Sequence, residues 1–378
     1  MGMILLAGLV GYLFKGIILT KGFAIYFIIQ SIICFIIGNI IWGKLVKMKK
    51  NHMTDKFKEF NRIDVDLWSK NRIILGITFI FPFRFIALVA IVFSWLVLMS
   101  ICTVGHDFTK PFTGWRRILF RMSNKISPRL ALLAAGYVRI NWNKKDDYDY
   151  SKWLGKDYKT PEFAVSSTSN HCAWTDIFIM LVRGSGVSFI AKAAIKDIFL
   201  FGRGGKAIDT IYFDRNGSHE EKEKLVEQIN ERQQNINDNK GEGISLHLFA
   251  EGLTSNNTHV LPFKRGVFSS LLPVRPIALK YSSSYFNPAH DVMPMSMHLF
   301  VLLSQITNSV EVIDLPIFGP NEYLYKNHMK PGEEKWMAYA RAIQGSIADV
   351  LDLPTSNANL GDKNKCKEAY LGDKVKLD

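Results

Sequence analysis

Cysteine is scarce in this sequence of 378 residues, which contains four. Cys34 and Cys102 lie inside long hydrophobic runs, and the spacing of Cys34, Cys102, Cys172 and Cys366 fits neither a disulfide framework nor a zinc site. Internal repeats and low-complexity blocks are also missing. We therefore expect no repeat fold, no redox centre, no metal site and no bound cofactor.

Charged residues are absent from two long segments, residues 22–43 and residues 85–105. About 20 apolar residues cross the core of a bilayer as a helix, so both segments are long enough to be membrane segments. The first is too long for the apolar part of a signal peptide, has no clear cleavage site and is followed by Lys44 and further lysines. We interpret it as a retained membrane anchor.

The second hydrophobic segment is preceded by Pro82 and Arg84, which interrupt an otherwise very long apolar element. It fits a membrane span or a helical hairpin that enters one leaflet. We expect four regions in the chain. They are a membrane anchor over residues 1–50, a basic linker with the second membrane segment over 51–110, an α/β domain over 111–354 and a polar flexible tail over 355–378.

The formal net charge is +13. Many lysines and arginines flank the hydrophobic segments, and such residues mark the cytoplasmic side of a membrane protein. Anionic lipids and polyphosphate ligands would also be attracted by this charge. Nucleic acid is not an expected partner, because an anchored chain without a recognition motif offers nothing beyond charge.

Short β-rich runs alternate with helix-like segments between Glu162 and Pro316. This alternation predicts an α/β fold built on a largely buried sheet. Ser218 followed by Glu221 forms a capping-box pattern before a solvent-exposed helix. The expected strands are residues 163–167, 187–192, 208–213, 244–250, 274–280 and 310–316. An amphipathic helix is expected over 333–351.

A polar turn with a histidine follows the first of these strands, in the sequence NHCAWTD. On one continuous helix, His171 and Asp176 would point about 140° apart and could not meet. They meet if His171 lies in the loop after the strand and Asp176 in the first helical turn. Asp176 would then hold Nδ1 and leave Nε2 to accept a proton. The alternative is an aspartate that stabilises a helix N-terminus beside an unrelated histidine.

Two further strand ends carry candidate binding residues. Arg215 follows the strand over 208–213, where an arginine can bind a phosphate through two bonds or can be an ordinary surface residue. Glu251 and Gly252 end the strand over 244–250, and a turn rich in hydroxyls and amides follows. The turn and the basic residues after it suit an anionic headgroup or CoA phosphates. These residues are Thr254, Asn256, Lys264 and Arg265.

A proline, Pro276, lies inside the apolar run VRPIALK. Proline cannot donate to a β-ladder, so its presence predicts an edge strand, a bulge or the start of a strand. We expect Pro276 to serve packing.

Four motifs thus follow the hydrophobic segments in a fixed order, and they contain His171, Arg215, Glu251 and Pro276. Motifs in this order resemble those of the glycerolipid acyltransferases, the lysophosphatidic-acid acyltransferase superfamily, and the resemblance covers about residues 73–350. The resemblance implies a mixed, mostly parallel central sheet flanked by helices. It implies that an acyl group passes from acyl-CoA, a cosubstrate, to a lysophospholipid or glycerol-phosphate hydroxyl. By similarity, His171 is the general base and Asp176 its partner. Asn170 belongs to the first motif, Arg215 to the second, Glu251 and Gly252 to the third, and Pro276 to the fourth.

The sequence departs from the family pattern at two places. Ala250 stands where the family usually has a proline before the Glu-Gly pair, which predicts a looser turn. Leu253 and Thr254 follow Gly252 where many lysophosphatidic-acid enzymes have an arginine. The sequence GLTSNN is more similar to the branch that acts on lysophosphatidylcholine and lysophosphatidylethanolamine. The stretch from Phe263 to Gly266 resembles glycerol-3-phosphate enzymes and keeps that acceptor, and lysophosphatidic acid, as alternatives.

The resemblance leads us to expect an integral membrane enzyme of the endoplasmic reticulum whose catalytic domain faces the cytosol. A catalytically inactive lipid-binding scaffold is the alternative from another class. Two glycosylation sequons begin at Asn216 and Asn256, and we expect neither to be modified in a cytosolic domain.

Overall fold

The computed structural model describes residues 21–52, 56–107, 112–184, 187–214, 217–282 and 285–371. The helices are α2 (Lys21–Lys50), α3 (Lys70–Phe79), α4 (Phe81–Thr103), α5 (Gly114–Ala134), α6 (Ser151–Leu154), α7 (Asp176–Gly184), α8 (Phe199–Ala207), α9 (His219–Asp238), α10 (Met295–Ser304), α11 (Glu322–His328), α12 (Lys335–Leu351) and α13 (Leu360–Leu371). The strands are β1 (Arg139–Lys144), β2 (Ser166–Ser169), β3 (Ile190–Lys192), β4 (Ile211–Phe213), β5 (Leu246–Phe249), β6 (Val274–Ser282) and β7 (Ser309–Asp314).

A five-stranded sheet in the order β1-β7-β6-β2-β5 forms the centre of the domain. The pairs β1–β7, β6–β2 and β2–β5 are parallel, whereas β6 and β7 are antiparallel. Strands β3 and β4 form a small parallel sheet of their own. The expected mixed, mostly parallel sheet flanked by helices is therefore confirmed.

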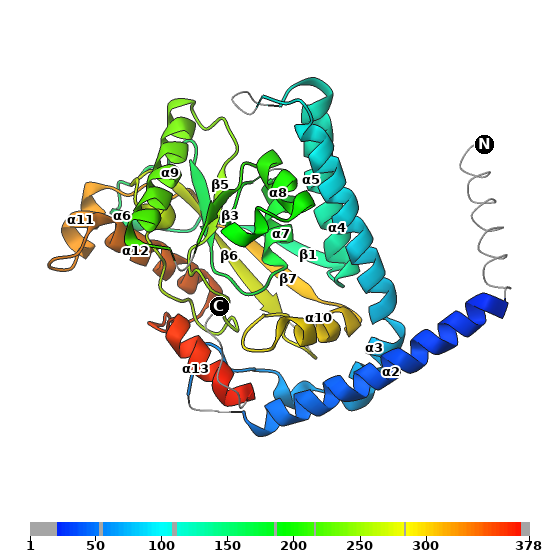
Figure 1. Ribbon diagram of the computed structural model, residues 1–378. Coiled ribbons are helices and arrows are strands. Elements are labelled where there is room, and N and C mark those ends of the chain that lie inside the picture. The colour runs from blue at the N-terminus through cyan, green and yellow to red at the C-terminus, as the bar shows by residue number, and fades with distance from the viewer. Residues whose placement is uncertain are drawn as a thin grey trace.

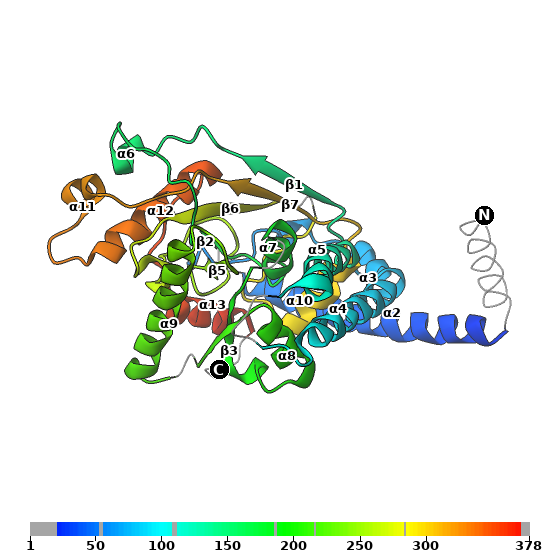
Figure 2. The ribbon, with the colours of Figure 1, turned by 90° about the horizontal axis from the view of Figure 1, so that it is seen from above.

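Helices cover both faces of the sheet because side chains alternate along each strand. Ile277 and Leu279 of β6 pack into a cluster with residues of α4, α5 and α7. Ala278, between them, packs on the opposite face with residues of α12. Figure 2, which views the molecule from above, shows α7 and α12 on opposite sides of β6. This part of β6 is therefore buried on both faces, as is typical of parallel strands in α/β proteins.

Pro276 is the third residue of β6, a central strand. Regular pairing with β7 begins one residue later, at Ile277 opposite Asp314, and Val274 forms an isolated bridge with Phe318. Two residues of β6 thus oppose three of the facing chain, which is a bulge. Proline is tolerated here, near the start of the strand, because the regular ladder is already interrupted.

The two hydrophobic segments form α2 and α4, which are long and apolar enough to cross a membrane. Helix α4 is continuous from Phe81 to Thr103, so it contains no hairpin turn. Pro82 lies in its first turn, where a missing N–H costs no helical bond. Arg84 donates to the carbonyls of Leu303, Gln305 and Ile306 at the end of α10. Figure 1 shows α4 beside α5, and α2 extending away from the sheet.

Both predicted helices of the domain are present. Helix α9 begins after Ser218, and the expected capping box is formed, since Glu221 N donates to Ser218 Oγ and Ser218 N donates to Glu221 Oε2. The C-terminal amphipathic pattern forms α12.

The expectation of a polar flexible tail over 355–378 is wrong for the helix α13. Cys366 and Tyr370 of α13 are fully buried in a cluster that contains Leu45 and Met48 of α2. The Asn51 side chain also donates to the Tyr370 carbonyl at 3.1 Å. The sequence of this segment predicted a flexible tail because its apolar residues are few and their packing partners are distant in the chain.

A buried ionic cluster connects the segment after α2 to the loop after β6. The Arg62 guanidinium is fully buried and pairs with Asp64 at 2.5 Å and Asp291 at 2.9 Å. It also donates to the carbonyls of Asn287 and Ala289, each at 3.0 Å. Burial opposes the charge of Arg62, but the carboxylates of Asp291 and Asp64 raise its pKa overall.

We predict that Arg62→Ala lowers the free energy of unfolding by about 3–5 kcal/mol, because two carboxylates would remain buried without their counter-ion. Thermal or denaturant unfolding of the purified chain measures this effect. Arg139→Ala, which removes an exposed arginine of β1, is the control and should cost less than about 0.5 kcal/mol. Equal stability of the two variants would contradict the prediction.

Candidate active site

The site lies where β2 and β5 end side by side. In the parallel register, Ser169 pairs with Phe249, so the residues that follow each strand leave the sheet at the same edge. His171 follows β2, and Glu251 follows β5. Open α/β sheets bind ligands beyond the carboxyl ends of their strands.

His171 occupies the loop between β2 and α7, and Asp176 is the first residue of α7. His171 Nδ1 lies 2.8 Å from Asp176 Oδ2. The bond requires the Nδ1–H tautomer, which leaves the lone pair on Nε2. Among the residues that the structure describes, Nε2 has no hydrogen-bond partner, and the side chain is 18% exposed. The predicted loop geometry is confirmed, whereas the role of a base stays a prediction.

The Asp176 carboxylate is fully buried and is satisfied by several donors. Oδ2 also accepts from the backbone N–H groups of Cys172 at 2.8 Å and Ala173 at 3.0 Å. Oδ1 accepts from the hydroxyl of Tyr281 on β6. Charge-assisted bonds and the helix N-terminus compensate the cost of burying this charge. Asp176 therefore stabilises the start of α7 and orients His171 at the same time.

Glu251 holds the backbone of the histidine loop. Its Oε2 accepts from His171 N at 2.9 Å, and its Oε1 accepts from Leu261 N at 2.9 Å. Ser255 N, in the turn after Glu251, donates to His171 O at 3.0 Å. Both backbone polar groups of His171 are thus bound by the turn over 251–255.

Burial raises the pKa of Glu251 to about 8, and the charge of Asp176 acts in the same direction. The two backbone N–H bonds, from Leu261 and His171, lower it in part. A carboxyl with such a pKa changes its charge close to neutral pH, so we expect the stability of the turn to depend on pH.

We predict that ionisation of Glu251 lowers the free energy of unfolding as the pH rises. Its pKa is about 8 in the folded chain and 4.5 when unperturbed, so the folded chain binds more protons between these values. The contribution of protonated Glu251 to the free energy of unfolding is complete below pH 4.5 and is lost as the pH rises through 8. The slope of this loss is up to about 1.4 kcal/mol per pH unit.

Thermal unfolding across this pH range measures the slope in wild type and in Glu251→Gln, which cannot titrate. Glu231→Gln, an exposed residue of α9, is the control and should keep the wild-type slope. The idea fails if Glu251→Gln and wild type lose stability in parallel.

Asn170 and Gly252 also lie at this edge. The Asn170 amide donates to Leu279 O at 2.9 Å and accepts from Leu279 N at 2.8 Å, which continues the β2–β6 pairing beyond the end of β2. Gly252 has a φ of +69°, a conformation that favours glycine. A Cβ at Gly252 would lie 3.7 Å from Lys264 Cγ, so the exposed Lys264 side chain lies beside the turn.

Ala250 gives the turn a bond that the proline of the family pattern could not make. Its backbone N–H donates to Ser169 O at 3.2 Å, so it extends the pairing of β2 and β5. Ala250 is also buried. The looser turn expected from the missing proline is therefore not supported by these contacts.

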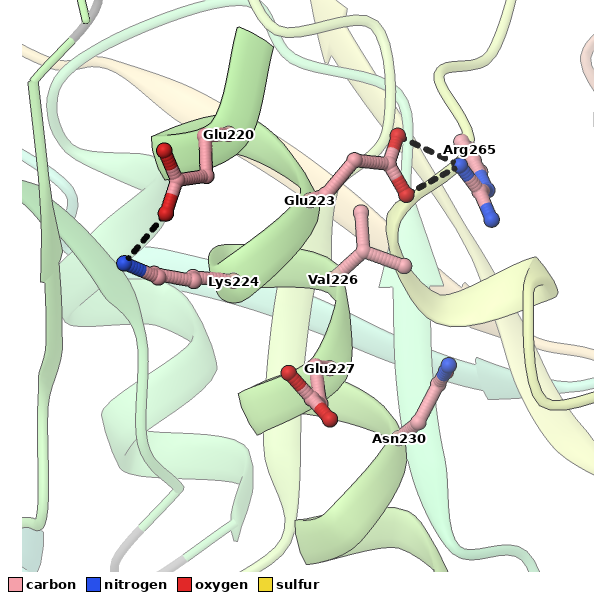
Figure 3. A pocket seen from close by; sticks show the side chains of 7 residues that line it. All are labelled: Glu220, Glu223, Lys224, Val226, Glu227, Asn230 and Arg265. Carbon is pink, nitrogen blue, oxygen red and sulfur yellow. Dashed lines mark hydrogen bonds and ion pairs between the residues drawn. The ribbon is translucent and has the colours of Figure 1, made fainter. Parts of the chain in front are cut away.

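Two proposed acceptor-binding residues are engaged elsewhere. Asn256 is fully buried, and its amide donates to Lys58 O at 2.6 Å and Asn61 O at 2.7 Å. It positions the segment after α2, and its burial excludes a glycan on the folded chain. Arg265 donates to both carboxylate oxygens of Glu223 on α9, at 2.8 and 2.9 Å. Figure 3 shows this pair at a surface pocket beside α9.

The remaining predicted site residues are Thr254 and Arg215. Thr254 lies in the turn, and its hydroxyl donates to His290 O. Arg215 lies outside the described residues, together with Asn216. No cluster of metal-ligating side chains occurs among the described residues.

Sequence reasoning missed three residues of the site. Tyr281 is one residue beyond the expected strand over 274–280, and its alternation with Leu279 could have placed it on the Asp176 face. Phe249, at the end of β5, stacks on the His171 ring with centroids 4.1 Å apart. Lys363 of α13 donates to Thr254 and had no local signal in the sequence.

Comparisons with known proteins identify the family of this chain. The Acyltransferase family model matches residues 160–280. A lyso-ornithine lipid O-acyltransferase of Brucella abortus (strain 2308) is 32% identical over 208 residues, which cover 50% of this chain and 68% of that protein. This chain belongs to the acyltransferase family.

Longer relatives match as well. The lysophospholipid acyltransferase LPEAT1 of Arabidopsis thaliana is 28% identical, covering 66% of this chain and 63% of that protein. The human lysophosphatidylcholine acyltransferase 1 is 24% identical, covering 71% and 48%. This chain therefore spans about half to two thirds of these relatives. The crystal structure of the 1-acyl-sn-glycerophosphate acyltransferase PlsC of Thermotoga maritima aligns at 17% identity with a TM-score of 0.45, covering 74% of this chain and 97% of that chain.

Proposed function

We propose that this protein transfers a fatty acyl group from acyl-CoA to the hydroxyl of a lysophospholipid. The observation that carries the proposal is the His171–Asp176 pair, held at the end of β2 with Nε2 of the histidine available. In the proposed reaction, Nε2 accepts the proton of the acceptor hydroxyl. The alkoxide oxygen attacks the thioester carbonyl, the C–S bond breaks, and the leaving thiolate takes the proton from His171.

The groups around His171 support a base rather than a nucleophile. Asp176 fixes the tautomer and would stabilise the imidazolium that forms during proton transfer. Cys172, the adjacent thiol, is fully buried, and burial raises its pKa well above the usual value. A buried neutral thiol is a poor nucleophile. The acyl group is therefore proposed to pass directly from the thioester to the acceptor oxygen.

We favour a lysophospholipid acceptor for two reasons. The sequence GLTSNN after Glu251 is similar to the branch that acts on lysophosphatidylcholine and lysophosphatidylethanolamine, and matched relatives carry lysophospholipid names. Glycerol-3-phosphate remains the second candidate, supported by the stretch from Phe263 to Gly266. The ion pair of Arg265 with Glu223 reduces that support, since this arginine already binds a carboxylate.

Membrane helices would bring lipid substrates to the site. Helix α2 carries Lys47, Lys49 and Lys50 in its last turn, where basic residues favour the cytoplasmic side. Helix α5 exposes Trp115, Ile118 and further apolar residues along one face, which suits contact with lipid. We propose an integral membrane enzyme, of the endoplasmic reticulum in a eukaryotic cell, with its catalytic domain in the cytosol.

An apolar groove of about 570 Å³ lies between α4, α8 and α10. Phe85, Val92 and Phe201 are among its lining residues, and none of the lining side chains is charged. The groove opens along a proposed membrane helix. Its chemistry suits the fatty acyl chain of a substrate.

We predict that His171→Ala lowers kcat by at least about 10³-fold and Asp176→Asn by about 10²–10⁴-fold, since one removes the base and the other its orienting acceptor. The assay uses purified protein with acyl-CoA and separate lysophosphatidylcholine, lysophosphatidylethanolamine, lysophosphatidic acid and glycerol-3-phosphate arms. His219→Ala, an exposed histidine of α9, is the control.

The highest rate should occur with a lysophospholipid that carries a headgroup beyond phosphate. A His171→Ala variant that matches wild type on every acceptor would falsify the catalytic assignment. Preference for glycerol-3-phosphate would establish the second candidate instead. Lipid binding without thiol release from acyl-CoA would indicate the inactive scaffold.

A further inference from the structure

Lys363 of the C-terminal helix α13 reaches the turn that binds His171. Its Nζ lies 2.7 Å from Thr254 O, 2.7 Å from Thr254 Oγ1 and 3.5 Å from His290 O. The three donors of one ammonium group therefore connect two segments that are distant in sequence from each other and from α13.

Both segments hold the histidine loop through backbone bonds. Ser255, next to Thr254, donates its N–H to His171 O at 3.0 Å. His290 donates its N–H to Cys172 O at 2.7 Å. Lys363 thus connects the two partners that fix the carbonyl groups of consecutive residues in the loop.

The position of Lys363 is itself fixed by the packing of α13. Cys366 and Tyr370, on the same helix, are fully buried against the end of α2 and the segment around Asn61. The bond of Arg62 N to the Tyr370 hydroxyl, at 3.3 Å, adds a second attachment. An anchored helix has already fixed the backbone of the lysine, so its bonds cost side-chain entropy alone and are more effective than those of a mobile tail.

We propose that Lys363 is a positioning residue of the acyltransferase, which holds Thr254 and His290 so that the His171 loop keeps its catalytic geometry. The proposal rests on the proposed function of His171. It makes α13 part of the catalytic unit, although this helix lies about 80 residues beyond the last family motif, at Pro276.

The positive charge of Lys363 gives the proposal a distinctive readout. It lowers the pKa of Glu251, whereas burial and the charge of Asp176 on α7 raise it. His171, from the β2–α7 loop, faces the same carboxyl through its backbone N–H. Since ionised Glu251 accepts both of its backbone bonds, kcat should rise as Glu251 ionises. Loss of the lysine charge should move this rise to higher pH.

The test compares Lys363→Met, Lys363→Arg and Lys365→Met in the full chain. Lys365 is an exposed residue of α13 and is the matched control. Lys363→Met should lower kcat about 10- to 100-fold, because small displacements of a catalytic group have effects of this size. Its pH–rate profile should shift to higher pH, and Lys363→Arg should restore most of the rate.

Hydrogen–deuterium exchange supplies a measurement that needs no activity. Lys363→Met should speed the exchange of amides over 171–173 and 252–257 and leave the β-sheet protected. The proposal is overturned if Lys363→Met matches Lys365→Met in rate, pH profile and exchange, or if exchange increases evenly over the whole domain. If the wild type transfers no acyl group, the proposed function fails, and local exchange still decides whether Lys363 holds the loop.

Discussion

The buried carboxylate of Asp176 is the constraint on which the site depends. A buried carboxylate needs hydrogen-bond donors in place of water. The donors to Asp176 are the ring of His171, the backbone N–H of Cys172 and the hydroxyl of Tyr281 on β6. These bonds hold the loop between β2 and α7 in its observed conformation. The orientation of His171 is therefore a consequence of satisfying Asp176, and catalysis would use a geometry that folding already requires.

The second constraint is the parallel pairing of β2 with β5, which brings Glu251 to the histidine loop from 80 residues away. The turn after Glu251 then serves two neighbours. Ser255 binds the histidine backbone, and Asn256 binds the segment that follows α2. Arg62 adds a connection from the same segment to the loop after β6, through its ion pairs with the buried carboxylates of Asp64 and Asp291. The segment that follows the hydrophobic helix α2 is thus joined to the candidate site by buried polar contacts.

Patterns confined to neighbouring residues were readable from the sequence. The capping box of α9, the apolar lengths of α2 and α4, and the loop position of His171 follow from local chemistry. Contacts between distant segments were not readable. Strand β1 was missed because its residues are mostly exposed, and α13 was taken for a tail because two buried side chains, Cys366 and Tyr370, fix it to segments about 300 residues earlier.

The roles of the turn residues show the same limit. Thr254, Asn256 and Arg265 were grouped as acceptor-binding because they are polar and close in sequence. Each of their side chains has an intramolecular partner, and these partners lie in three different parts of the chain. Residue type and spacing predict that a turn is polar, but only the packing decides which polar atoms face a substrate.

The central claim is direct acyl transfer, and the stoichiometry of the reaction tests it most directly. Purified wild-type protein receives acyl-CoA labelled in the acyl chain together with a lysophospholipid, and free thiol and labelled phospholipid are counted at the same time points. Direct transfer predicts one thiol released for each phospholipid formed, and no release above background when the acceptor is omitted. A burst of thiol release without acceptor, equal in amount to the protein and leaving the labelled acyl group bound to the protein, would contradict it.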